Sequence, residues 1–270
     1  MNYELTLLPE VLWDKTFFVP LLRRMEESGM INDYKMDRDK DPMGAAIADY
    51  HRHGVAGRLR VFAPDFDEDE IPVDTLFRTL DEMPVLEQKA LGLAQGRILD
   101  VGAGAGCHTL VLQQRGHRVT AIDISPLSVA TMTERGVADA RAVDFWDMEG
   151  TFDTILMLMN GIGIVGTLDA LPRFFAHTRQ LLGPGGRLLL DSTDIAYLYE
   201  DEDGRIELPQ DGYYGEMTYR MQYKRIKGDS FHWLYVDPIT LAAQAQECGF
   251  RMEILASDED GSYLASLQCI

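Results

Sequence analysis

Apolar runs that stop at an acidic residue recur through the middle of the chain. Such a run precedes each of Asp100, Asp123, Asp144 and Asp191. Short apolar runs bounded by turn residues predict buried strands, and amphipathic stretches between them predict helices. We therefore expect strands at about 97–101, 118–123, 138–144, 152–158, 187–191, 250–256 and 262–268, the last two forming a closing antiparallel hairpin.

Three glycines at alternate positions follow the first of these strands. Gly102, Gly104 and Gly106 separate the carboxylate of Asp100 from an apolar helical stripe that begins near Leu110. Glycine permits positive φ and lets the backbone approach a ligand closely. The free N–H groups at the start of the helix favour a negatively charged ligand group. The pattern predicts a ligand-binding turn between a strand and a helix.

The spacing of the glycines separates two classes of ligand. A dinucleotide site has the pattern Gly-x-Gly-x-x-Gly, whereas here Cys107 stands at the third glycine position and Gly106 comes one residue early. Asp100 at the strand end can accept hydrogen bonds from a cationic ligand. Asp123 lies at the distance from the turn at which an acid reaches ribose hydroxyls, which suits either ligand. An NAD-dependent oxidoreductase is therefore the weaker alternative.

The run Leu99-Asp100-Val101-Gly102-x-Gly104-x-Gly106 resembles motif I of the class I S-adenosylmethionine-dependent methyltransferases. The segment 181–191 is similar to the L-x-P-G-G-x-L-x-x-D signature of the same family, and the resemblance extends over about 96–191. It implies an α/β Rossmann-like fold. Its mostly parallel sheet would have seven strands in the order 3-2-1-4-5-7-6, with helices on both faces.

The resemblance also implies the cofactor, S-adenosyl-L-methionine, and the product, S-adenosyl-L-homocysteine. Asp123 would bind the ribose, and Asp144 would bind the adenine amino group. The cofactor contacts implied in this way come from Asp100, Gly102, Ala103, Gly104, Gly106, Asp123, Ile124, Asp144, Phe145 and Met159. A non-catalytic protein that binds this cofactor would keep the same acids, and this is a second alternative.

The segment after the fourth expected strand faces the transferred methyl group in this family. Asn160 matches the Asn of the Asn-Ser segment found in small-molecule methyltransferases, and the Asn/Asp-Pro-Pro-aromatic tetrapeptide of enzymes acting on DNA bases is missing. An amide there either orients an acceptor or caps the next helix. The candidate catalytic residues are His108, Asn160 and Asp191, and Asp194 and His232 are further candidates for a general base.

Two segments exceed what the core fold needs. We expect residues 1–95 to form an N-terminal helical cap and residues 96–270 the cofactor-binding domain, with a β-hairpin insertion at about 194–236 that turns at Gly228-Asp229. In the family such extensions cover the cofactor and the acceptor. Arg78 in the first segment is a candidate partner for the cofactor's carboxylate.

Composition narrows the possible partners. The 270 residues include 44 acids and 25 bases, so the net charge of −19 disfavours nucleic-acid acceptors and favours a small molecule. No apolar run approaches a membrane span, and Glu4, Glu10 and Asp14 do not fit a signal peptide, so we expect a cytoplasmic protein without a membrane partner. The three cysteines show no metal-ligand spacing, and no metal site is expected. The oligomeric state does not follow from the sequence.

Overall fold

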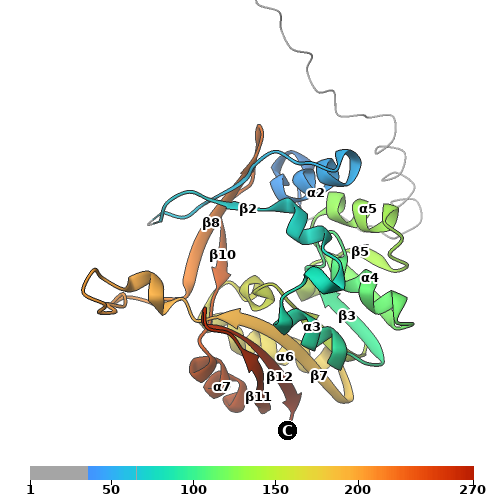
Figure 1. Cartoon of the computed structure of the whole chain (residues 1–270). Helices are drawn as coiled ribbons and strands as arrows, with labels where there is room; N and C mark the ends of the chain where they lie inside the picture. The colour runs from blue at the N-terminus through green and yellow to red at the C-terminus, as the bar shows by residue number, and fades with distance from the viewer. Residues whose placement is uncertain (1–35, 65) are drawn as a thin grey trace, which may run out of the picture.

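The computed structural model describes residues 36–64 and 66–270, and a seven-stranded sheet forms the centre of this part of the chain (Figure 1). The strand order is β5-β4-β3-β6-β7-β12-β11. The first five strands are parallel, and β12 and β11 are antiparallel to their neighbours. The bounds are β3 Arg97–Val101, β4 Arg118–Asp123, β5 Ala140–Ala142, β6 Phe152–Met157, β7 Leu182–Thr193, β11 Phe250–Ser257 and β12 Ser262–Cys269. The predicted fold and strand order are confirmed.

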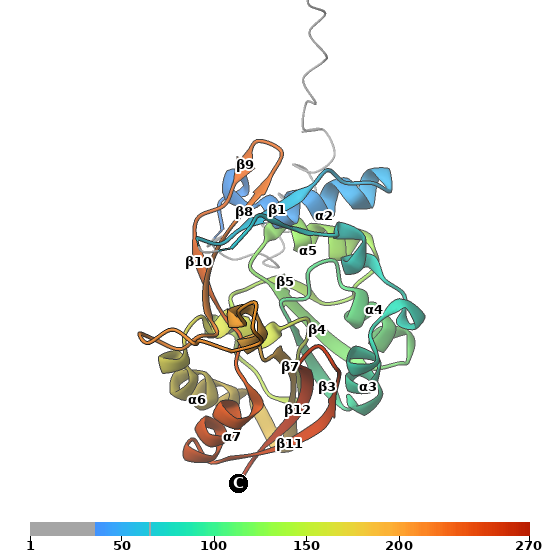
Figure 2. The same ribbon diagram turned by 60° about the vertical axis from the view of Figure 1, so that its left-hand side comes forward.

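Helices cover both faces of this sheet. One face carries α3 (Val85–Leu93), α4 (Cys107–Gln114) and α5 (Pro126–Glu134), and the other carries α6 (Leu171–Leu181) and α7 (Pro238–Glu247) (Figures 1 and 2). Their starts follow capping chemistry, because Ser125 and Asp237 accept hydrogen bonds from the first turns of α5 and α7, each with proline at the first position. None of the described helices is long and apolar enough to cross a bilayer.

A second sheet forms a cap over the carboxyl ends of the parallel strands (Figure 2). Its order is β10-β8-β1-β2, and β9 pairs with β8. The bounds are β1 Leu59–Phe62, β2 Asp69–Ile71, β8 Glu216–Tyr223, β9 Ile226–Lys227 and β10 Phe231–Leu234. The cap is therefore a composite of helix α2 (Pro42–His53), two strands that precede the core sheet, and three strands from the expected insertion. The boundary near residue 95 stays a prediction.

Short 3-10 helices connect these elements. They are η1 Arg38–Lys40, η2 Val73–Phe77, η3 Leu80–Glu82, η4 Phe145–Asp147, η5 Gly161–Val165, η6 Leu168–Ala170 and η7 Ala196–Tyr199. Two of them, η2 and η3, lie in the segment before residue 95 that is expected to form a helical cap, where the chain crosses from the cap to the core. η5 follows β6 after a turn at 158–160.

The expected turn at Gly228-Asp229 is wrong. The strands β8 and β9 reverse at Lys224 and Arg225, and Lys224 has a left-handed φ of 51°. Tertiary contacts decide this, because the Lys224 ammonium and the Tyr223 hydroxyl both bind Asp49 on α2, at 2.5 and 2.8 Å. Asp229 instead binds the Lys40 ammonium at 2.8 Å, so the Gly-Asp pair lies between β9 and β10.

Two close contacts dock the cap on the core. Asp41 caps α2 by accepting from the Gly44 N–H at 2.7 Å, and its other oxygen accepts from the Ser125 hydroxyl at 2.5 Å, beside the end of β4. At the far end of the cap, the Trp233 indole lies against Gly163 in η5. A Cβ at Gly163 would come within 2.0 Å of the indole ring.

Replacing Gly163 by Ala should therefore displace the end of β10 from η5. The clash is with a half-buried ring that has little room to move, so we expect a loss of about 1–3 kcal/mol in the free energy of unfolding. Gly92→Ala is the matched control, because a Cβ on this exposed α3 position meets nothing within 4 Å and should be neutral or stabilising. Thermal unfolding of both variants, followed by tryptophan fluorescence, checks this. Equal stability of the two would contradict the docking role of Gly163.

Candidate functional site

The glycine turn after β3 lies under the cap and has the geometry that its sequence predicts. Gly102, Gly104 and Gly106 have φ values of 67°, 56° and 81°, a region that other residues rarely adopt. The space that a Cβ on Gly102 would occupy is open to 4 Å, whereas a Cβ on Gly106 would lie 3.0 Å from the Val137 side chain. Gly106 thus serves packing, and Gly102 leaves the turn open to a ligand. Ala103 holds the turn to β4, because its N–H binds the Ile122 carbonyl at 3.0 Å.

Asp123 at the end of β4 fixes the other side of the turn. One of its oxygens accepts from the Gly104 N–H at 2.9 Å, and the other accepts from the Ser125 N–H at 2.8 Å. Burial raises the pKa of this carboxyl to about 6, and the nearby charges of Asp41 and Asp100 act in the same direction. The next side chain, Ile124, is apolar but 45% exposed, which suits a position that covers part of a ligand.

A buried polar network lies behind the glycine turn. The Asp100 carboxylate is 2% exposed and accepts from the Thr109 hydroxyl at 2.5 Å. His108 binds Glu87 on α3 at 2.6 Å, and the same Glu87 carboxylate accepts from Arg78 at 2.8 and 3.0 Å. Burial disfavours the charged forms of both His108 and Glu87. The hydrogen bond and the opposite charges of this pair outweigh the effect of burial, so the pKa of His108 is raised and the pKa of Glu87 is lowered.

Arg78 retains an unpaired hydrogen-bond donor, its Nε, among the residues described. Its guanidinium is mostly buried, and within the described part of the chain nothing accepts a hydrogen bond from its Nε. A buried polar atom without a partner is rare in folded proteins and requires an explanation. An anionic ligand group beside Arg78 would supply the missing acceptor.

A strained turn follows β6 at the same edge of the sheet. Met159 and Asn160 both have left-handed φ values, 63° and 56°, although neither is glycine. Asp191 on β7 holds the turn, because its carboxylate accepts from the N–H groups of Met159, Asn160 and Gly161 at 3.0, 2.8 and 3.4 Å. Burial raises the pKa of Asp191 to about 6. The side-chain oxygen Oδ1 of Asn160 accepts from the Thr193 hydroxyl at 3.0 Å, and this hydrogen bond orients the Asn160 side-chain amide.

The candidates for a general base differ in whether a nitrogen or oxygen atom of the side chain is left to accept a proton from a substrate. His108 is bonded to Glu87, and the oxygens of Asp191 are occupied by backbone N–H groups. His232 is exposed, pairs with Thr218 at 3.2 Å and lies beside Gly166 after η5. Asp194 follows the end of β7, and both of its hydrogen bonds, from the Tyr214 hydroxyl at 2.8 Å and the Ala196 N–H at 3.0 Å, go to Oδ1. Its Oδ2 accepts no hydrogen bond from the residues described.

Asp144, the expected adenine contact, and Phe145, another expected cofactor contact, follow the end of β5. The Asp144 carboxylate accepts from the Trp146 N–H at 3.0 Å. The Phe145 side chain is 3% exposed and packs on Phe174 and His177, with ring centroids 5.6 and 4.9 Å apart. The Phe145 side chain is therefore part of the core.

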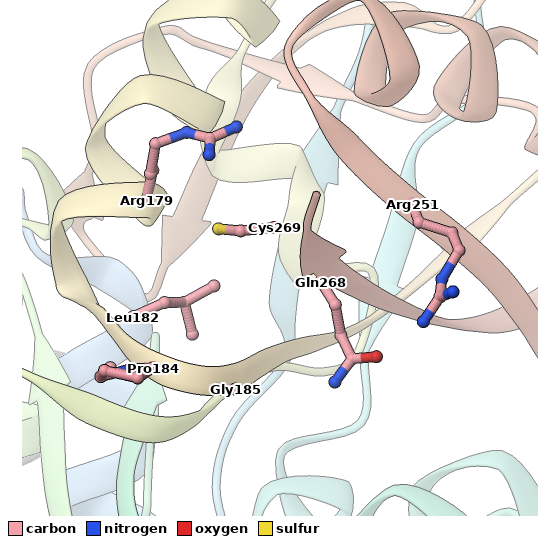
Figure 3. Close-up of a pocket in the computed structure, with 9 residues that line it drawn as sticks. Arg179, Leu182, Pro184, Gly185, Arg251, Gln268 and Cys269 are labelled. Atoms are coloured by element: carbon pink, nitrogen blue, oxygen red, sulfur yellow. The ribbon is translucent and has the colours of Figure 1, made fainter.

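A pocket of about 400 Å³ lies at the opposite end of the sheet (Figure 3). It lies between the carboxyl end of α6, the amino ends of β7 and β11 and the carboxyl end of β12, and its lining includes Arg179, Leu182, Arg251, Gln268 and Cys269. Because the parallel strands present their carboxyl ends at the other edge, this pocket is separate from the glycine turn. No group of three or more His, Cys, Asp or Glu side chains is arranged for a metal ion in the part of the chain described.

The chain matches the model of the family described as methyltransferase domain over residues 58–254. It is also similar to a solved S-adenosylmethionine-dependent methyltransferase from Bacteroides fragilis, in complex with S-adenosyl-L-homocysteine. The two are 55% identical with a TM-score of 0.82, over 87% of this chain and 97% of that one. The chain belongs to the S-adenosylmethionine-dependent methyltransferase family.

Other members of this methyltransferase family match a shorter region. A cypemycin N-terminal methyltransferase from Streptomyces sp is 32% identical over 104 residues, 37% of this chain and 42% of its own. A ubiquinone biosynthesis O-methyltransferase from Xanthomonas oryzae pv. oryzae is 32% identical over 111 residues, 38% of this chain and 45% of its own. The chain thus spans less than half the length of these curated relatives.

Glu87 is the site residue that the sequence reading missed in this methyltransferase. It lies on α3 among Leu86, Ala90 and Leu91, all buried, so it is a lone acid on an apolar helix face. That pattern was a usable signal, because a buried carboxylate requires a charged partner. The partners themselves, Arg78 and His108, come from other elements and could not be read from the helix.

The ligand-free protein should contain two aspartates with raised pKa values. Asp123 and Asp191 should titrate near pH 6 rather than 3.8, since burial disfavours their charged forms. The folded state then holds protons that the unfolded state has lost, so the stability from each group is present below about pH 4 and disappears as the pH rises through about 6. Each pKa difference changes the free energy of unfolding by at most about 3 kcal/mol across this pH range.

Carbon NMR of protein labelled at the aspartate carboxyl groups measures these values directly. The spectra of Asp123→Asn and Asp191→Asn assign the two signals. Titration of both assigned carboxyls near pH 4 would contradict the inferred effect of burial.

Proposed function

We propose that this chain transfers a methyl group from S-adenosyl-L-methionine to an oxygen or nitrogen atom of a small-molecule acceptor. The observation that carries the proposal is the open glycine turn, which Asp123 binds on one side, together with the buried Arg78, which Glu87 links to His108 at the start of α4 and whose Nε is unpaired among the described residues. The 55% identical relative with S-adenosyl-L-homocysteine supports the choice of cofactor. The net charge of −19 supports a small acceptor rather than a nucleic acid.

The residues present suit such a cofactor. Arg78 would bind its carboxylate with the guanidinium nitrogens that Glu87 leaves unused. Asp123 would accept from the ribose hydroxyls, and Ile124 would cover the adenine. We also propose cofactor contacts from Asp100, Gly102, Ala103, Gly104, Gly106, Asp144, Phe145 and Met159.

Bound S-adenosyl-L-methionine supplies a methyl group on a positively charged sulfur, which the acceptor's lone pair takes in an in-line displacement while the bonding electron pair returns to the sulfur. The chain's part is to align the acceptor and to exclude water. Asp191 fixes the turn that presents Asn160, whose amide would orient the acceptor. Asp194, with one oxygen free among the described residues, would take the acceptor's proton. His108 would stabilise Glu87 and Arg78.

One relative is named an N-terminal methyltransferase and another an O-methyltransferase, and the proposal includes both acceptor atoms. A protein that only binds the cofactor would share the cofactor site. It would show no methyl transfer to any acceptor, although its affinity for S-adenosyl-L-homocysteine would be unchanged.

Calorimetric titration with S-adenosyl-L-homocysteine tests the cofactor site. Asp123→Ala should weaken binding by roughly tenfold or more, because a carboxylate hydrogen bond to the ribose contributes about 1.5–3 kcal/mol. Asp169→Ala, at an exposed position on η6, is the control and should bind like the wild type. NAD serves as the negative ligand. Failure of folded wild-type protein to bind S-adenosyl-L-homocysteine would refute the proposal.

The role of Arg78 can be separated from general stability by the choice of ligand. Arg78→Gln should weaken S-adenosyl-L-homocysteine binding by about tenfold, because a charge-assisted hydrogen bond to the carboxylate is lost. Methylthioadenosine lacks that carboxylate and should bind the variant and the wild type equally. Equal losses for both ligands would show that Arg78 supports the fold and does not bind the carboxylate.

A further inference from the structure

The cap sheet separates its side chains by face. Because directly paired residues point to the same side of a sheet, Val61, Met221, Tyr219 and Phe231 share one face. Arg60, Phe62 and Arg220 occupy the other face, where both guanidiniums lie over the Phe62 ring at 4.8 and 5.2 Å. We call the first set of four residues the inner wall.

The face that carries the inner wall packs at its two ends against α2 of the cap and η5 of the core. At one end Tyr223 is 1% exposed and its hydroxyl binds Asp49 on α2. At the other end Trp233 lies against Gly163 in η5, which follows the turn held by Asp191. Between these anchors the four residues of the inner wall remain partly exposed. The wall therefore spans from the cofactor cover, α2, to the expected acceptor side.

Aromatic rings line the face that carries the inner wall, and no described side chain of the cap strands on that face is a cation. Tyr235, Tyr219, Phe231 and Trp233 form a continuous row, with successive ring centroids 6.5, 6.2 and 6.2 Å apart. Among the described residues of the cap strands, the charged side chain on this face is an acid, Asp69, which pairs with Val61. The negative charge of Asp69 adds to the burial that raises the pKa values of both tyrosines.

From this arrangement we infer that the acceptor is an aromatic molecule without an anionic group, held by its ring against the inner wall. The inference rests on the proposed methyl transfer and specifies its substrate class. Ring faces and edges on the wall suit an aromatic partner. The acid at the rim favours a neutral or cationic ligand, whereas a phosphate or carboxylate would find no cation on this face.

Binding to the protein saturated with S-adenosyl-L-homocysteine tests this inference without turnover. The probes are tyramine, which is a cationic phenol, 4-hydroxybenzoate, which is an anionic phenol, and ethanolamine, which has no ring. We expect tyramine to bind at least about tenfold more tightly than either of the others. Tryptophan fluorescence and calorimetry report the binding.

Three variants locate the effect. Tyr219→Leu and Phe231→Leu should each weaken tyramine binding by about threefold to tenfold, since each removes one ring contact. Phe62→Leu removes a similarly half-buried ring from the opposite face and should leave tyramine binding unchanged. Asp69→Lys, at an exposed position, should reverse the preference in favour of 4-hydroxybenzoate.

The outcomes separate this inference from the proposed function. Unchanged affinity for S-adenosyl-L-homocysteine shows that each variant is folded. If that cofactor product binds but 4-hydroxybenzoate or ethanolamine binds as well as tyramine, the inferred acceptor class is wrong and the cofactor assignment stands. An equal loss of tyramine affinity in Phe62→Leu and Phe231→Leu would likewise overturn the inferred acceptor class. If S-adenosyl-L-homocysteine itself does not bind the wild type, the proposed function fails.

Discussion

Buried carboxylates at the carboxyl ends of the strands hold the loops of the site in their shapes. Asp123 binds the N–H groups on both sides of the glycine turn, and Asp191 binds three successive N–H groups after β6. Each interaction fixes backbone that would otherwise be strained or unpaired, including the left-handed pair Met159 and Asn160. The cost is a carboxyl whose ionisation is opposed by burial, which is why both pKa values rise to about 6. A cationic ligand beside these groups would reduce that cost, because it would stabilise the ionised carboxylates.

The parts of the fold and site that could be read from the sequence are those set by local chemistry. Three alternate glycines need positive φ, and an acid closing an apolar strand reaches the loop beside it, so Gly102, Asp123 and Asp191 were all identifiable. The core strands followed from their apolar runs for the same reason. Their order depended on the family resemblance, since apolar runs alone do not specify which strands are neighbours.

The parts that could not be read depend on contacts between distant segments. The turn between β8 and β9 falls at Lys224 because Asp49 on α2 binds it, which no local turn propensity reveals. Glu87 and Arg78 meet only because η2 and η3 lead the chain back to α3. Likewise β1 and β8 pair across more than 150 residues, as Leu59 opposite Tyr223 shows. Nothing in either short strand indicates its partner.

The pairing of β1 with β8 links the part of the cap that lies near the glycine turn to the inner wall. Helix α2 packs near the glycine turn, with the Ile47 side chain 4.0 Å from where a Gly104 Cβ would lie. The same helix binds Tyr223 and Lys224 of the cap sheet through Asp49, and Asp41 at its start binds Ser125 next to the Asp123 loop. A displacement of α2 would therefore disturb the Asp123 carboxylate and the inner wall together. In an in-line displacement the relative position of donor and acceptor matters most, and an indivisible cap is a direct structural way to keep both in register.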